Sequence, residues 1–230
     1  MILSLLLVCS LFTPDISKTS YPLRVTGRAS AVEALVRIIN HEVYPVAPVE
    51  AKLINAQTKE YGIRLIHKLD DAGIAKRENR FRCVLNYMLG DSSKIFRIRL
   101  VENDGAILIG NGRRGIIDIA DAQKFDSNPK ECNFNSFNIL LHELYEQYQL
   151  QVINHLQPGK ITSAQLKSAH KKAVQKESNF YSLTEVKTEA VIDDEYIHIE
   201  FMSRVDSTRT HYYAYHSYGN IERVERVCSH

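Results

Sequence analysis

The spacing of apolar residues changes along this sequence, and the change limits the folds open to it. Over residues 80–120 apolar side chains recur at every second position, as in strands that bury one face. Over residues 137–152 and 163–178 they recur at every third or fourth position, as on one face of a helix. Because the two patterns occupy separate stretches, they predict an α+β fold in which an antiparallel sheet packs against helices.

The predicted sheet contains an antiparallel meander. Residues 80–89 alternate between apolar and polar types, and the alternation resumes over residues 96–100. The dipeptide Asp104-Gly105, which comes before an apolar run at residues 106–109, is a strong hairpin signal. We therefore expect consecutive antiparallel strands in this stretch.

Three glycines follow the meander in the order G-x-G-x-x-G, at Gly110, Gly112 and Gly115. That motif binds dinucleotides when the N-terminus of a helix follows it and holds the pyrophosphate. Here residues 115–119 have the composition of another strand. The glycines therefore predict a hairpin loop, and they argue against a Rossmann fold.

Other segments complete the predicted domain. Apolar spacing predicts a helix over residues 29–40, period-two alternation predicts a strand over residues 196–201, and a hairpin is expected over residues 210–227 with its turn at Gly219-Asn220. No internal repeat or low-complexity linker divides the chain, so residues 21–230 are predicted to form a single domain.

Composition excludes several classes of protein. The chain has 230 residues, of which 44% are hydrophobic and 24% charged, as in ordinary globular domains. Its 29 Lys and Arg residues against 27 Asp and Glu residues give a net charge of only +2. Such a balance produces no strong positive field, so nucleic acid is not the expected partner.

The N-terminus carries an apolar run from Ile2 to Phe12. Eleven residues are too few to span a membrane as a helix, but they match the length of a signal-peptide core. We therefore predict no transmembrane segment, a leader over residues 1–20, and export of the remaining chain. No Lys or Arg precedes the run, and the alternative is a cytoplasmic protein in which it forms a buried strand.

The sequence His142-Glu143-Leu144-Tyr145-Glu146 places two metal-binding side chain types at positions i and i+4 of a predicted helix. A catalytic zinc site of the thermolysin kind needs two imidazoles, one carboxylate and a general base. His142, Glu146 and His170 supply the three ligands, with His170 on the next predicted helix. Glu143 supplies the base. The same ligand set would also hold Fe²⁺, which is the weaker alternative.

Two further interpretations concern the same helices. Glu177, seven residues after His170, shares its predicted helix face and is expected to accept a hydrogen bond from the free imidazole nitrogen; the alternative is a fourth ligand. The competing interpretation of the whole motif is an ordinary polar helix face that holds no metal.

Three stretches together resemble a known family. They are residues 115–121, residues 140–147, and residues 169–173 followed by Glu177, all within residues 80–180. In these stretches the chain is similar to the zincin-like metallopeptidase domains at the C-termini of Rhs-type and other bacterial polymorphic toxins. The resemblance implies a zincin-like fold. It also implies a zinc site built from the HExxE helix and the downstream Ala-His helix, and a toxin-like role. Asp118 and Asp121 match the family pattern, although a turn at the end of a strand explains them as well.

Two functions therefore stand as hypotheses. The first is a secreted zinc metallopeptidase, which hydrolyses a protein or peptide substrate with metal-activated water and uses Glu143 as the base. The second is a degenerate zincin or immunity-like binding module without catalysis, whose Tyr-rich C-terminal strands form the contact surface. The metal content of the protein separates the two hypotheses.

Overall fold

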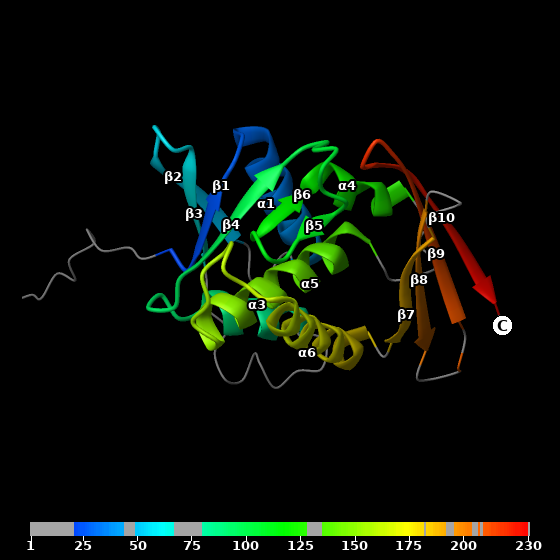
Figure 1. The fold of residues 1–230 in the computed structure, drawn as a ribbon. Helices are drawn as coiled ribbons and strands as arrows, with labels where there is room; N and C mark the ends of the chain where they lie inside the picture. The colour runs from blue at the N-terminus through cyan, green and yellow to red at the C-terminus, as the bar shows by residue number, and fades with distance from the viewer. Residues whose placement is uncertain are drawn as a thin grey trace, which may run out of the picture.

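The computed structural model describes residues 21–43, 49–66, 80–127, 135–181, 183–191, 196–203, 207 and 209–229. The predicted leader over residues 1–20 lies outside the described residues. The described part contains two β-sheets and a group of helices (Figure 1), which confirms the α+β class. Among these described helices, none is both long enough and apolar enough to cross a membrane.

Among the described residues, the larger sheet has six strands in the order β2-β3-β1-β4-β6-β5. The strands are β1 (Leu23–Thr26), β2 (Val49–Asn55), β3 (Glu60–Leu65), β4 (Phe96–Val101), β5 (Gly110–Asn111) and β6 (Ile116–Asp118). Strand β4 runs parallel to both β1 and β6, whereas the remaining pairs are antiparallel. The sheet is therefore mixed, whereas the sequence had predicted an antiparallel sheet from residues 80–120.

One face of this sheet forms the main core. In β4, Phe96, Ile98 and Leu100 are buried, while Arg97 and Arg99 between them are exposed. The buried side chains belong to one apolar cluster with residues of helices α1 (Ala29–Val43) and α5 (Ser136–Tyr148). Alternation thus directs the apolar side chains toward the helices.

Residues 80–89 form helix α3 (Arg80–Leu89), so the strand predicted there was wrong. Among residues 84–89, whose burial is described, the buried ones are Val84, Leu85, Met88 and Leu89. That spacing of one, three and one residues lies on a single helical face, whereas a strand would have buried every second position. The segment is apolar at so many positions that both periods fit it.

The predicted hairpin at Asp104-Gly105 is also absent, and residues 106–109 do not form a strand. The Asp118 carboxylate accepts hydrogen bonds from the backbone N–H groups of Asn103, at 3.1 Å, and Asp104, at 2.7 Å, and so holds this stretch as a loop. The chain then enters β5, the last strand in the sheet order, and returns along β6, and this β5–β6 hairpin is antiparallel. The hairpin predicted for the glycine motif is therefore confirmed.

The three helices predicted from apolar spacing are present as α1, α5 and α6 (Ser163–Tyr181). Asn135 caps α5 in a reciprocal capping box with Asn138. Thr162 and Gln165 exchange equivalent bonds at the start of α6. Such caps satisfy the first backbone N–H groups of a helix, which explains where both helices begin.

The C-terminal strands form a second, antiparallel sheet in the order β10-β9-β8-β7, on the right in Figure 1. The strands are β7 (Leu183–Val191), β8 (Tyr196–Ser203), β9 (Arg209–Ser217) and β10 (Asn220–Ser229). The strand and the hairpin predicted here are confirmed, although the turn lies one residue earlier, at Tyr218-Gly219. Strand β7 and strands β1–β3 had not been predicted.

Candidate metal centre

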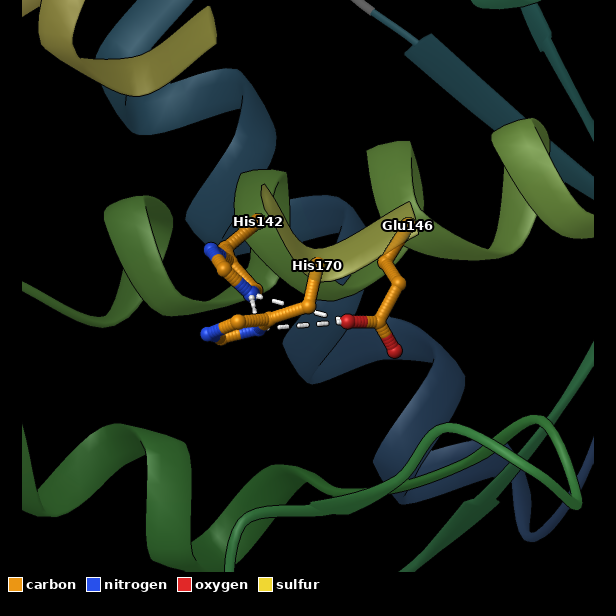
Figure 2. A group of neighbouring side chains, drawn as sticks. All are labelled: His142, Glu146 and His170. Carbon is orange, nitrogen blue, oxygen red and sulfur yellow. Dashed lines mark hydrogen bonds and ion pairs between the residues drawn. The ribbon is translucent and has the colours of Figure 1, made fainter. Parts of the chain in front are cut away.

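Helices α5 and α6 bring His142, Glu146 and His170 together (Figure 2). His142 and Glu146 lie one turn apart on α5, and His170 reaches them from α6. His142 Nε2 lies 3.0 Å from His170 Nδ1, and Glu146 Oε2 lies 3.3 Å from His170 Nδ1 and 3.9 Å from His142 Nε2. The three predicted ligands therefore form one cluster of donor atoms.

These separations match those of a metal's ligands. Zinc binds imidazole nitrogen and carboxylate oxygen at about 2.0–2.2 Å, and the corners of such a tetrahedron lie about 3.3–3.4 Å apart. The three donor atoms are within a few tenths of an ångström of that spacing at most of their edges. The residues present therefore fit a divalent metal ion without rearrangement of either helix.

The burial of the cluster also favours a divalent metal ion. The Glu146 side chain is 6% exposed and that of His142 is 13% exposed, whereas His170 is 45% exposed. Both ion pairs of Glu146 are with imidazoles, which carry charge only when protonated. A buried carboxylate is costly without a positive partner, and a divalent cation bound by the two neutral imidazoles would supply one. The exposed edge of His170 leaves the centre open to solvent.

The glycines of the β5–β6 hairpin pack directly against the ligand helix. A Cβ on Gly110 would lie 2.7 Å from the Glu143 carboxyl carbon. A Cβ on Gly112 would lie 2.5 Å from Leu166 of α6 and closer still to Glu146 Oε1. Each position therefore accepts only glycine without displacement of a side chain from α5 or α6. The sequence motif had revealed the hairpin but not this contact.

Polar contacts hold the same hairpin in place. Gln147 Nε2 donates a hydrogen bond of 2.8 Å to the backbone oxygen of Gly112. At the hairpin tip, the Arg113 guanidinium donates to the Ser163 hydroxyl at the start of α6. The hairpin thus bridges both helices that carry ligands. Gln147 comes directly after the HExxE motif. That position is the one sequence signal that could have identified Gln147 as a residue near the site.

Glu143 and Glu177 occupy different positions from the three ligands. Glu143 is half-buried on α5, and its carboxylate lies against Gly110 of the edge strand β5. Its role as a base stays a prediction. Glu177 lies on α6, but its side chain is outside the described residues.

Asp118 and Asp121, which match the family pattern, organise the backbone. Asp118 caps the short helix α4 (Ile119–Gln123). Asp121 accepts hydrogen bonds from the N–H groups of Ile221, at 2.8 Å, and Ile109, at 3.3 Å, so it links helix α4 to strand β10 and to the loop before β5. Burial raises the pKa of the Asp121 carboxyl above its ordinary value. Both residues therefore have a structural role.

Comparison with known proteins found no match to a family model, a curated protein or a solved structure. The identity, spacing and burial of the donor atoms show a group of residues that could hold a metal ion.

Proposed function

We propose that this protein is a zinc-dependent metallopeptidase whose metal is held by His142, Glu146 and His170. The observation that carries this proposal is the cluster of two imidazoles and one buried carboxylate, at separations suited to zinc, with Glu143 next to one ligand in the chain. Three protein ligands leave a coordination position open, as catalytic zinc sites require. Fe²⁺ is the alternative metal for the same ligands.

The residues around the centre have separate tasks in peptide hydrolysis. A bound zinc ion supplies Lewis-acid chemistry, because it lowers the pKa of water to about 7 and polarises a carbonyl group. Glu143 takes the proton of the attacking water and returns it to the departing amine. Glu146 and the two imidazoles keep the centre in place during both steps.

The position of the hairpin suggests how a peptide substrate would reach the centre. Strand β5 is the last strand of the six-stranded sheet, and its Gly110 touches the Glu143 carboxylate. An extended peptide can add to such an edge through backbone hydrogen bonds. A substrate paired with β5 would run beside the proposed base.

Export and a toxin-like role belong to the same proposal, and they rest on the leader-like residues 1–20 and on the family resemblance. We expect the mature protein to lack the segment up to about Ser20. N-terminal sequencing of native protein tests this expectation, and a sequence that starts at Met1 would count against export.

Substitution of a ligand and of the base should have different effects. His170→Ala should lower zinc affinity by at least about 10-fold to 100-fold, because loss of a residue that only hydrogen-bonds a metal ligand already has that effect. Peptidase activity should fall in proportion to the zinc that remains bound. Glu143→Gln should keep the metal and abolish hydrolysis. Glu33→Gln, at an exposed position on α1, is the matched control and should change neither property.

Elemental analysis of protein purified without a metal-binding tag, combined with a peptidase assay, measures both effects. If Glu143→Gln loses metal while His170→Ala keeps it, the assignment of roles is wrong. If the wild-type protein binds no metal at this centre, the degenerate zincin or immunity-like binding module replaces the enzyme. Anaerobic reconstitution with iron and with zinc, each followed by the assay, identifies the active metal.

A further inference from the structure

A second group of two histidines and one glutamate lies on the C-terminal sheet, away from the helices of the first centre. Strands β8 and β9 pair so that Glu200 is opposite His211 and His198 is opposite Tyr213. Ile199 and Tyr212, at the alternating positions, are buried in the main core. The two histidines and Glu200 therefore share the outer face of this sheet.

The donor atoms of this group are as close together as those of a metal site. His198 Nε2 lies 3.1 Å from His211 Nδ1, and each of the three residues offers a ligand atom within 4.8 Å of the other two. Two nitrogens bound to one tetrahedral zinc ion lie about 3.3–3.4 Å apart. A metal could therefore enter between the imidazoles with a shift of only a few tenths of an ångström.

Neighbouring side chains hold these donors in position. The His198 ring is stacked on Tyr213, with centroids 4.9 Å apart and planes at 6°. Arg209 forms an ion pair with Oε1 of Glu200 and so helps to fix the orientation of the carboxylate. Metal-binding carboxylates are commonly oriented by a second partner in this way. Such support reduces the side-chain freedom that binding would otherwise have to restrict.

The exposure of the group suits an open site. Glu200 is buried, at 7% exposure, whereas His198 and His211 are half-buried. The two half-buried imidazoles give a metal access from solvent, and the Glu200 carboxylate beside them is an anionic ligand even with Arg209 as its ion-pair partner. Two nitrogens and one oxygen are the donors preferred by zinc and neighbouring divalent transition metals, and not by calcium or magnesium.

We propose that His198, Glu200 and His211 form a second binding site for a divalent transition metal such as zinc. The site is separate from the one at His142, Glu146 and His170, since the two groups lie on different secondary-structure elements. It therefore stands whether or not the protein is a peptidase. A cross-strand histidine pair that packs without a metal is the competing account.

The test uses full-length, tag-free protein in which His142→Ala and His170→Ala remove the first centre. Zinc titrated against a chelating indicator should still bind at one equivalent. Adding His198→Ala and His211→Ala should abolish that binding. Adding His216→Ala and His41→Ala instead should leave zinc binding unchanged. His216 lies on strand β9, as His211 does, and His41 is exposed on α1.

Two outcomes would overturn the proposal: no zinc bound once the first centre is removed, or equal binding after loss of His198 and His211. Circular dichroism establishes that each variant is folded. If the variants without His198 and His211 fail to fold, wild-type protein labelled with ¹⁵N gives the answer instead. Zinc should then shift the imidazole nitrogen resonances of His198 and His211, and unchanged resonances would refute the site.

Discussion

Gly112→Ala tests whether the β5–β6 hairpin and the metal centre depend on each other. A Cβ at this position would lie 2.5 Å from Leu166 Cδ1, about 1 Å inside the optimum for two carbon atoms, and still closer to Glu146 Oε1. Both obstructing atoms are at the ends of flexible side chains, which can move away. The fold should therefore tolerate the substitution, with a cost within the range of about 1–3 kcal/mol for overpacking.

Zinc affinity should be more sensitive to Gly112→Ala than the stability of the fold is. Glu146 can relieve the clash only by moving its carboxylate, and metal–ligand distances are maintained to within about 0.2 Å. A shift of the Glu146 carboxylate by several tenths of an ångström would therefore weaken one of the three metal–ligand bonds. We expect zinc affinity at this centre to fall by at least about 10-fold, since loss of even an indirect supporting contact has that effect.

The assay is zinc competition against a chelating indicator, at a temperature where the protein is fully folded and with His198→Ala and His211→Ala present. Gly159→Ala is the matched control. A Cβ there meets no atom within 4 Å, but the backbone has φ +86°, so alanine costs about 1–2 kcal/mol of stability. The control should lose stability and keep its metal. Wild-type affinity in Gly112→Ala, or an equal loss in both variants, would refute the reasoning.

Three further outcomes concern the contacts that helix α4 and the β9–β10 hairpin make with each other and with the loop at residues 102–109. Asp121→Asn leaves one of the N–H groups of Ile109 and Ile221 without an acceptor. The free energy of unfolding, measured by urea titration, should therefore fall by about 1–3 kcal/mol. A loss below about 0.5 kcal/mol would contradict the structural role of Asp121. The pKa of Asp121 is raised by burial, so the folded state keeps this proton where the unfolded chain has released it. The advantage of wild type over Asp121→Asn should therefore decrease as pH rises through that pKa, and a constant or growing advantage would show the opposite sign. Gly219→Ala, at φ +80° and with its Cβ directed into the backbone oxygen of Gly105, should lower the melting temperature by several degrees, and an unchanged melting temperature would mean that the two loops do not touch.

Local sequence determined much of the candidate site. The capping residues Asn135 and Thr162 define the starts of α5 and α6, and their apolar spacing defines the buried faces. The i, i+4 placement of His142 and Glu146 follows from helical geometry alone. The apolar spacing and the placement of His142 and Glu146 depend on residues within a few positions of one another, which is why the sequence predicted them.

Tertiary structure decided the rest, because the deciding contacts join residues far apart in the chain. Residues 80–89 are apolar at so many positions that they fit a strand or a helix, and packing of Val84 and Met88 into the core selects the helix. The parallel pairing of β4 with β1 spans more than 70 residues, and no local pattern encodes it. Only the folded chain places Gly112 against Glu146 and Glu200 opposite His211, since each contact requires two elements to meet in space.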